Sequence, residues 1–448
     1  MTHLGFRVDF FRNLGAVLTK FIIINIKLAL KMNKNKGNVF AIGICFFLFA
    51  MISFVTGLQN PMGIIAKAQF GATNLMSQLG NAANFIAYAF MGLPAGFLLK
   101  GKGYKFSALA AVTVGFVGVG ISYLSGVFGS FAVYLLGAFV SGFSMCMLNT
   151  VVNPLLNTLG GGGNKGNQLI QLAGSCNSLA ATIVPVLAGY LIGEVTEKTQ
   201  VADVNPALFI AMAIFALAFV IVFFSNIPEP ELEAAANAPV EKKEGTMDSI
   251  KGALSHKNLV FGVIAIFLYV GIEVGIPNVA NLYMTSADGL AMAPAIAGTL
   301  VGAYWFLMLV GRLVGGVIGG KVSSRAMIMS VSLAAIVFIL FGMFLPSSLT
   351  ISMLGTQVPV AIGFFVLCGL CTSVMWGAIF NLAVEGLGKY TSIASGLFMV
   401  MVCGGGILPL VQGAVADFAG YIQSYWVLII ALGYIFWFGF AGSKVKKA

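Results

Sequence analysis

The stretch MGLPAGFLLKGKGYKF at residues 91–106 decides the fold, because it recurs as VGRLVGGVIGGKVSSR at residues 310–325. The two copies share three glycines and one lysine at a constant offset of 219 residues. The matching pairs are Gly92 and Gly311, Gly96 and Gly315, Gly101 and Gly320, and Lys102 and Lys321. Glycines four residues apart let membrane helices approach closely. The repeat therefore indicates two related halves, each with a close helix contact followed by a basic turn.

The composition around this repeat is that of a membrane protein. Of 448 residues, 59% are apolar and 8% are charged, whereas a soluble domain carries about 25% charged residues. A helix needs about 20 mostly apolar residues to cross the hydrocarbon core. Such runs occur at 38–58, 79–99, 106–126, 131–155, 168–192, 206–226, 258–280, 295–318, 326–345, 359–383, 392–415 and 424–442. We therefore predict an all-α membrane protein with twelve transmembrane helices in two pseudo-symmetric six-helix bundles.

The longest hydrophilic stretch separates these bundles. We predict bundles at 38–226 and 258–448, the second with a short basic tail, joined by a cytoplasmic linker at 227–257. A basic N-terminal segment, 1–37, comes first. The residues before Met32 are interpreted as an upstream extension or, alternatively, as an interfacial amphipathic helix or a signal peptide.

The positive charge predicts how the chain is oriented. With a cytoplasmic N-terminus, 21 of the 24 lysines and arginines fall in predicted cytoplasmic segments. This bias follows the positive-inside rule. It explains the net charge of +10 without a nucleic-acid partner. We expect a multi-pass protein of the cytoplasmic (inner) membrane, with both termini in the cytoplasm and the lipid bilayer as its surroundings.

The sequence carries no pattern typical of an enzyme or a metal site. Cys368 and Cys371 have a metal-like spacing, but no second pair follows, and neither histidine lies in a predicted span. The glycines at 160–163 lack the ending of a phosphate-binding loop, which argues against an ATP-driven pump. We predict no enzyme activity, no metal and no cofactor apart from a possible coupling ion, H+ or Na+.

The first helix of each half contains a polar segment with a proline. These segments are GLQNP at 57–61 and GIPN at 275–278. Broken helices at corresponding positions of two halves point to a transport site near the membrane midplane. We therefore expect both helices to break there, and we expect alternating access between the bundles. Gln59, Asn60, Asn278 and Asn281 are predicted to bind substrate.

Glu273 is the one carboxylate predicted to lie deep inside a span. No lysine or arginine lies within a helical turn of it in sequence, so it is expected to bind a proton or a cation. We predict an ion-coupling role, with a structural hydrogen bond as the alternative. Arg312 is expected near the cytoplasmic end of its helix, where an ion pair with Glu385 would form a gate. Snorkelling of Arg312 is the alternative.

Amide side chains form a polar stripe in the first half. Asn149, Asn153 and Asn157 recur every four residues, which places them on one helix face. An amide offers both donors and acceptors, so such a stripe suits the hydroxyls of a sugar. Bonding between neighbouring helices is the alternative. The remaining predicted substrate-binding residues are Gln171, Asn177, Asn381 and Trp376, the last as an aromatic partner for the apolar face of a sugar.

These motifs resemble the major facilitator superfamily and, within it, the fucose/galactose/glucose proton symporters. The matching pieces are GLPAGFLLKGKGYK at 92–105, NTVVNPLLNTLG at 149–160, QLAGSCNS at 171–178, FLYVGIEVGIPN at 267–278 and MWGAIFNLAVEGLGKYTS at 375–392. The resemblance implies monosaccharide uptake driven by an ion gradient. It also implies a substrate role for Asn177. Two acidic positions of the family are Asn60 and Asn149 in this chain, so the resemblance leaves the coupling role to Glu273.

The leading prediction is a secondary active transporter that imports a neutral monosaccharide, with a monomer sufficient for the mechanism. One alternative is a carrier of another small solute, such as an acidic or N-acetylated sugar or an efflux substrate. A non-transporting sugar sensor is the other alternative, because a fold does not by itself fix a function. The sequence does not distinguish between individual sugars, or between H+, Na+ and uncoupled transport.

Overall fold

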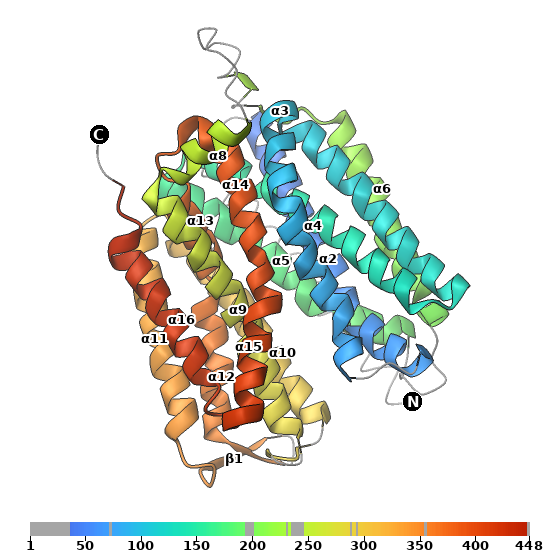
Figure 1. The fold of residues 1–448 in the computed structure, drawn as a ribbon, viewed down its shortest axis with the longest axis vertical. Helices are drawn as coiled ribbons and strands as arrows, with labels where there is room; N and C mark the ends of the chain where they lie inside the picture. The colour runs from blue at the N-terminus through green and yellow to red at the C-terminus, as the bar shows by residue number, and fades with distance from the viewer. Residues whose placement is uncertain are drawn as a thin grey trace.

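The computed structural model describes residues 36–70, 74–192, 201–229, 232–233, 246–286, 289–292, 294–353 and 356–445, and these residues are mainly helical (Figure 1). The α-helices are α2 (Lys36–Phe70), α3 (Asn74–Phe128), α4 (Phe131–Leu159), α5 (Gly163–Ile192), α6 (Asn205–Phe224), α8 (Thr246–Leu254), α9 (Lys257–Thr285), α10 (Pro294–Ile318), α11 (Ser324–Phe344), α12 (Val360–Thr372), α13 (Met375–Ala383), α14 (Thr391–Val400), α15 (Gly404–Ala419) and α16 (Tyr425–Trp437). The shorter elements are η1 (Val201–Val204), η2 (Gly388–Tyr390), η3 (Met401–Cys403), η4 (Phe438–Gly442), β1 (Thr350–Met353) and β2 (Thr356–Pro359).

The helices form two halves, α2 to α6 and α9 to α16, which lie side by side in Figure 1. The chain passes from one half to the other at the end of the molecule where α8 lies, which we call the linker end. The antiparallel hairpin of β1 and β2 lies at the opposite end, which we call the hairpin end. The halves contact each other through α3 with α14 and through α5 with α10.

Glycines within both copies of the repeat lie in these contacts, although the repeated Gly311 and Gly315 pack against Ser373 and Val374 of their own half. Gly96 of α3 packs against α14, where an added Cβ atom would lie 3.0 Å from the Cα atom of Gly396. In the second copy, Gly316, which follows the repeated Gly315 in α10, packs against α5, where an added Cβ would lie 2.5 Å from a methyl group of Leu172. Side chains would force both helix pairs apart. The expected close approach is confirmed for Gly92 and Gly96, and both copies of the repeat lie at the contact between the halves.

The predicted twelve crossings agree with the helices observed. In the described part of the chain, ten helical stretches are long and apolar enough to cross a membrane. One of them, Ala82–Phe128, covers two predicted crossings, which meet at a kink where Gly103 has a φ of 82°. The predicted crossing at 168–192 corresponds to α5. The protein is therefore a multi-pass helical membrane protein with the predicted fold.

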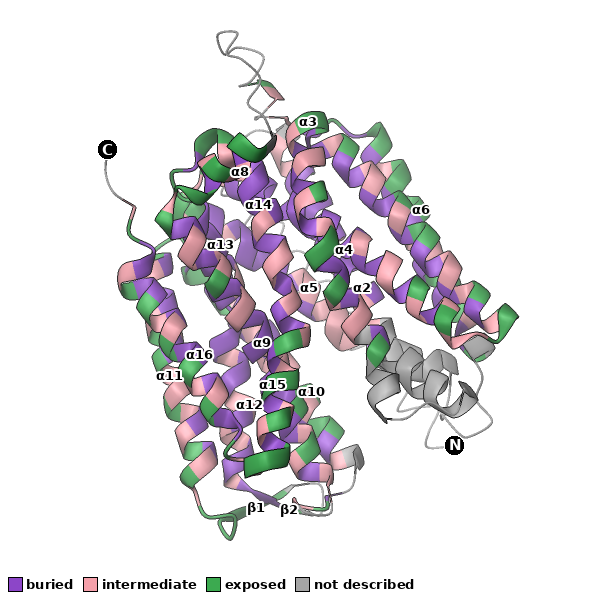
Figure 2. Ribbon diagram, viewed as in Figure 1, coloured by how far each residue is buried: buried purple, intermediate pink, exposed green. Residues whose placement is uncertain are grey.

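Exposed and buried residues occur side by side along the outer helices (Figure 2). Both sets include large apolar side chains. On α6, which has a mean hydropathy typical of a membrane span, Phe209, Leu217 and Phe224 are exposed while Ala211, Phe215 and Ala218 are buried. Exposed apolar patches of this extent need a nonaqueous partner. The outer face of α6 is therefore a lipid-facing surface.

The predicted helix breaks at the two proline segments are wrong. Helix α2 runs through 57–61, and α9 runs through Pro277 without interruption. The observed interruptions lie elsewhere, between α12 and α13 at Ser373–Val374 and at η3 between α14 and α15. A proline is tolerated within a membrane helix when a neighbouring group satisfies the carbonyl that it leaves free.

Some predictions fall outside the described residues. The segment before residue 36, including the alternatives for the residues before Met32, is one of them. Residues 230–231 and 234–245 of the predicted linker are others, while the short helix α8 lies within its described part. Gln59 and Asn60 belong to α2, and their side chains lie outside the described part of the structure.

Candidate functional site

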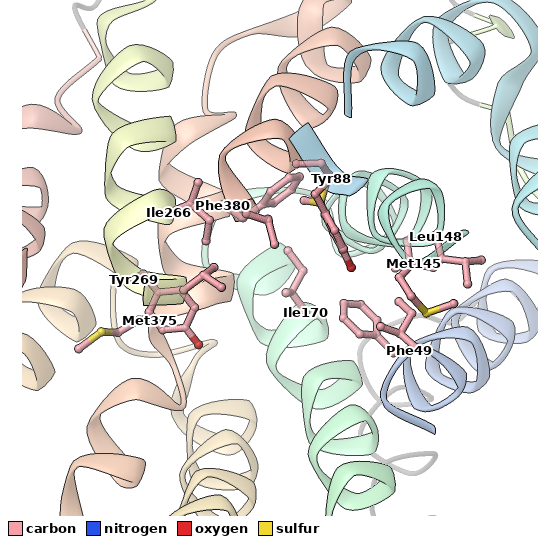
Figure 3. Close-up of a cluster of buried hydrophobic side chains, with 14 of the residues drawn as sticks. Phe49, Tyr88, Met145, Leu148, Ile170, Ile266, Tyr269, Met375 and Phe380 are labelled. Carbon is pink, nitrogen blue, oxygen red and sulfur yellow. The ribbon is translucent and has the colours of Figure 1, made fainter. Parts of the chain in front are cut away.

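A cavity of about 680 Å³ lies between the two halves. Its walls come from α2, α3, α4 and α5 on one side, and from α9, α10, α13 and η3 on the other. Its polar and tryptophan lining residues are Ser53, Thr56, Asn84, Tyr88, Asn149, Gln171, Asn177, Ser178, Glu273, Asn278, Asn281, Trp305, Arg312 and Trp376. Phe49, Tyr88 and Ile170 belong to the packed side chains of Figure 3 and also line the cavity. The cavity thus joins apolar surface with a limited set of polar groups, as small-molecule sites do.

Direct hydrogen bonds between the halves close the linker end of the cavity. Asn157 of α4 donates its Nδ2 to Oδ1 of Asn381 in α13, at 3.2 Å. Gln168 of α5 donates its Nε2 to the carbonyl of Gly316 in α10, at 2.7 Å. The amide of Asn381 also donates to Ser324 Oγ at 3.0 Å. The first two bonds join neutral groups of opposite halves beside the linker, and the third holds Asn381 within its own half.

Another bond between the halves uses a backbone carbonyl that a proline leaves without its helical partner. Pro154 lacks the N–H that would bond to the carbonyl of Thr150 one turn earlier in α4. Ser395 of α14 donates its hydroxyl to that carbonyl at 3.1 Å. The irregularity in α4 therefore serves as a docking point for the opposite half.

The floor of the cavity consists of two more such bonds. Trp376 of α13 donates its Nε1 to Asn153 Oδ1 at 3.0 Å. Gln171 of α5 donates its Nε2 to the carbonyl of Val374 at 2.7 Å, at the interruption between α12 and α13. Trp376 and Gln171 line the cavity, as predicted, whereas Asn153 and Asn381 do not. Those two asparagines were expected to contact substrate, but their amides bond to protein groups that join the halves.

Two asparagines on the α4–α5 wall have nearly saturated amides. Asn149 donates its Nδ2 to the Tyr88 hydroxyl and to the Met145 carbonyl, both at 3.1 Å. Asn177 donates its Nδ2 to the carbonyl of Phe49 at 2.9 Å. Its Oδ1 accepts from Arg312 at 3.3 Å. The amides of Asn149 and Asn177 therefore have fixed orientations. One N–H of Asn177 is left for a ligand.

The opposite wall contains an ion pair. Arg312 Nη2 lies 3.3 Å from Glu273 Oε1, and the two side chains are 8% and 14% exposed. The sequence suggested that Glu273 has no cation nearby, and that is wrong because α10 brings Arg312 beside α9. The expected pair of Arg312 with Glu385 is also wrong. Glu385 is exposed, and its carbonyl accepts from Asn258 Nδ2 at 2.9 Å.

The other donors of Arg312 are used as well. Nη1 donates to the Gly174 carbonyl at 3.0 Å and to Ser178 Oγ at 2.7 Å, so the side chain reaches across to α5 in the first half. Nε donates to the carbonyl of Ser373 at 3.3 Å, which the interruption after α12 leaves accessible. A guanidinium engaged at all three nitrogens is held in one position. Arg312 therefore links the carboxylate of Glu273 to the opposite half.

Pro277 explains the local backbone around Glu273. It removes the N–H that would bond to the Glu273 carbonyl one turn earlier. The Tyr304 hydroxyl of α10 donates to this carbonyl at 3.1 Å and contacts Thr372 Oγ1 at 3.1 Å. The tyrosine thereby keeps α9 continuous and positions Glu273 beside α10.

The remaining predicted residues lie farther along α9. Asn278 and Asn281 line the cavity beyond Glu273, toward the end of α9 that lies away from the linker. Asn278 is exposed, so both of its donors and its acceptor can meet a solute that enters from that end.

Sequence reasoning missed several polar groups of the site, among them Asn84, Tyr88 and Ser178. All three line the cavity, and Ser178 directly follows the predicted Asn177. Asn84 is 3% exposed and its Nδ2 has no partner among the described residues. A buried donor without a partner costs free energy unless a ligand or water satisfies it. Asn84 and Tyr88 are four residues apart, the same spacing that revealed the polar stripe in α4, and this spacing could have identified them.

Comparisons with known proteins agree with this architecture. The profile of the Major Facilitator Superfamily matches residues 42–409. The glucose/galactose transporter of Brucella abortus biovar 1 (strain 9-941) is 30% identical over 416 residues, which cover 92% of this chain and 95% of that protein. The L-fucose-proton symporter of Escherichia coli (strain K12) is 24% identical over 441 residues, or 93% and 97% of the two chains.

A solved structure shows the same fold. The crystal structure of the transporter FucP in the outward conformation superimposes with a TM-score of 0.77 at 19% identity, over 92% of this chain and 100% of that chain. The family match spans both halves and the cavity between them. This chain belongs to the major facilitator superfamily.

Proposed function

We propose that this protein is a secondary active transporter that imports a neutral monosaccharide by alternating access, and not an enzyme. The observation that carries the proposal is the cavity of about 680 Å³ between two halves, with amides on one wall and an ion pair on the other. That volume lies within the range of about 300–1,000 Å³ typical of small-molecule sites. The names of the relatives, a glucose/galactose transporter and an L-fucose-proton symporter, support a sugar as substrate.

The engagement of Arg312 supports a neutral substrate. It is the one cation among the lining residues of the described cavity, and its nitrogens bond to Glu273, Ser373, Gly174 and Ser178. An anionic substrate would have to displace Glu273 or these carbonyls. A sugar hydroxyl needs only the remaining amide and hydroxyl groups.

The predicted orientation of the chain supports an outward-facing state. We place the linker end in the cytoplasm because 21 of the 24 lysines and arginines then lie on the cytoplasmic side. The bonds between the halves at the linker end then make this an outward-facing state of an inner-membrane protein. A single chain contains the whole cavity, so a monomer suffices.

Glu273 is our candidate for the coupling residue. The Arg312 guanidinium contacts one oxygen of Glu273, Oε1, and the side chain is partly exposed to the cavity. Binding of H+ or Na+ there would weaken the attraction to Arg312. Since Arg312 also bonds to α5, ion binding at Glu273 would loosen a contact between the halves.

The test is uptake into proteoliposomes that contain the purified full-length protein. Labelled D-glucose, D-galactose, L-fucose and D-mannose are supplied with an inward H+ gradient, an inward Na+ gradient or none. We expect one or more sugars to accumulate above equilibrium with one of the gradients, and empty liposomes to show only leakage. Failure of all four sugars to enter with folded protein would overturn the sugar assignment, in favour of another solute or a sensor.

A further inference from the structure

Tyr88 and Asn149 form a hydrogen-bonded pair at the cavity that the proposed coupling chemistry does not use. Tyr88 comes from α3 and Asn149 from α4, and both line the cavity. They are 4% and 6% exposed, and Asn149 Nδ2 lies 3.1 Å from the Tyr88 hydroxyl oxygen. Figure 3 shows the Tyr88 ring near Phe49 and Ile170, which line the same cavity.

The surroundings of Asn149 fix the direction of this hydrogen bond. Its Nδ2 also donates to the Met145 carbonyl at 3.1 Å, and its Oδ1 accepts from Asn153 at 3.4 Å. Turning the amide over would place its oxygen against the Met145 carbonyl, where two acceptors would face each other. The amide nitrogen therefore faces Tyr88, and an amide nitrogen can only donate.

The hydroxyl of Tyr88 must then be the acceptor, which leaves its own proton free. Among the described residues, no group accepts this proton. The neighbouring cavity surface from Phe49 and Ile170 is apolar and offers no acceptor. A phenol that accepts one hydrogen bond can still donate one. The pair therefore presents a single hydrogen-bond donor to the cavity.

We propose that Tyr88 is a specificity-determining residue that donates its phenolic hydrogen to an oxygen of the transported sugar. Asn149 is a positioning residue, because it holds the Tyr88 oxygen as an acceptor and so keeps the proton directed at the ligand. A carboxylate at position 149 could only accept, and it would take that proton for itself. Because the amide donates to the Tyr88 hydroxyl, the hydroxyl does not donate to the protein and can donate to the substrate. This inference rests on the proposed sugar transport and names one group that selects among sugars.

The test combines Tyr88→Phe with monodeoxy sugars. For the sugar that the wild type accumulates best, KM is measured for the parent sugar and for each monodeoxy derivative, in wild type and variant. Loss of one neutral hydrogen bond should raise KM for the parent sugar about fivefold. One deoxy derivative lacks the oxygen that accepts from Tyr88. For this derivative, the wild type and Tyr88→Phe should have KM values within about twofold of each other. A variant that has only lost packing would show the same penalty for every sugar.

Two further variants protect this test against a folding defect. Tyr434→Phe removes a hydroxyl that donates to the Phe261 carbonyl outside the cavity, so KM should stay at the wild-type value for all sugars. Asn149→Asp places an acceptor beside the Tyr88 hydroxyl, so the hydroxyl donates its proton to residue 149 instead of to the sugar. We expect it to raise KM, and adding Tyr88→Phe to it should change KM less than twofold.

The outcomes separate the two proposals. If the wild type transports a sugar and Tyr88→Phe leaves every KM unchanged, or raises all of them equally, the role of Tyr88 is overturned while sugar transport stands. If adding Tyr88→Phe to Asn149→Asp raises KM by a further factor of about five, the positioning role of Asn149 is overturned. If the wild type transports none of the sugars, the proposed function itself fails.

Discussion

The two walls of the cavity differ in chemistry, although they belong to related halves of the chain. The α4–α5 wall carries neutral amides, such as Asn149 and Asn177, whose orientations are fixed by protein partners. The α9–α10 wall carries the ion pair of Glu273 and Arg312. Neutral groups can discriminate hydroxyls without changing charge, whereas a carboxylate can bind a cation. The difference indicates that the α4–α5 wall recognises the sugar and the α9–α10 wall binds the coupling ion. Arg312 connects the two walls through its hydrogen bond to Ser178.

Removing one member of the ion pair should give the largest effect on stability. Arg312→Met leaves the largely buried carboxylate of Glu273 without its cation, and the loss should approach the cost of about 3–5 kcal/mol for a fully buried pair. We expect a matching fall in the free energy of unfolding, measured in detergent micelles. Adding Glu273→Gln should recover most of this loss, because no buried charge then remains.

Arg325→Met serves as a matched control, since Arg325 donates to the Ser443 carbonyl away from the cavity. A similar loss in this control, or no recovery in the double variant, would mean that the ion pair is not what stabilises the α9–α10 wall.

The carbonyl freed by Pro277 gives a second test of the charged wall. Tyr304→Phe leaves the Glu273 carbonyl without its donor and should cost about 1–3 kcal/mol. Combining it with Pro277→Ala restores the helical N–H and should regain much of that free energy. Tyr425→Phe also removes a bond to an α9 carbonyl, that of Ile276, but the helix itself can still satisfy that carbonyl. Unfolding curves should therefore rank Tyr304→Phe as the more destabilised variant, and equal losses would argue against the proline explanation.

The bond between Ser395 and Thr150 tests how the linker end is closed, with the smallest expected effect. Ser395→Ala removes one neutral bond between the halves, worth about 1 kcal/mol, or roughly fivefold in the balance between states. Spin labels at positions 165 and 321, which are exposed in opposite halves at the linker end, report that balance as a distance distribution in a cysteine-free background.

In that background, Ser395→Ala should increase the share of long distances. Ser330→Ala, which removes a hydroxyl bonded to its own helix, should leave the distribution unchanged. Identical distributions in all three proteins would show that the Ser395 bond does not hold the linker end closed.

The elements that sequence predicts best are those set by local composition. Each crossing depends on about 20 consecutive residues, and the glycine repeat follows from the steric needs of the helix contact that it forms. Both are confirmed. The neutral stripe of α4 could also be predicted from its four-residue spacing. Asn149 of this stripe lines the cavity, whereas Asn153 and Asn157 form hydrogen bonds between the halves.

The charged wall could not be predicted in the same way. Glu273 and Arg312 are 39 residues apart, and nothing local to either residue indicates which partner the packing of α9 and α10 supplies. The continuity of α9 was missed because the donor that compensates for Pro277 is Tyr304, on another helix. Tyr88 was overlooked because a single tyrosine in an apolar span also fits core packing. Its free proton becomes visible only once the orientation of Asn149 is known.

The central claim is that Glu273 couples ion binding to sugar transport while the amide wall binds the sugar. Glu273→Gln tests it most directly, because glutamine keeps the size of the side chain and an oxygen for Arg312 but cannot be protonated or carry a charge. Sugar accumulation under an ion gradient and sugar exchange without a gradient are measured in the same proteoliposomes. We predict that the variant exchanges sugar but does not concentrate it above equilibrium. Accumulation equal to that of the wild type would contradict this account.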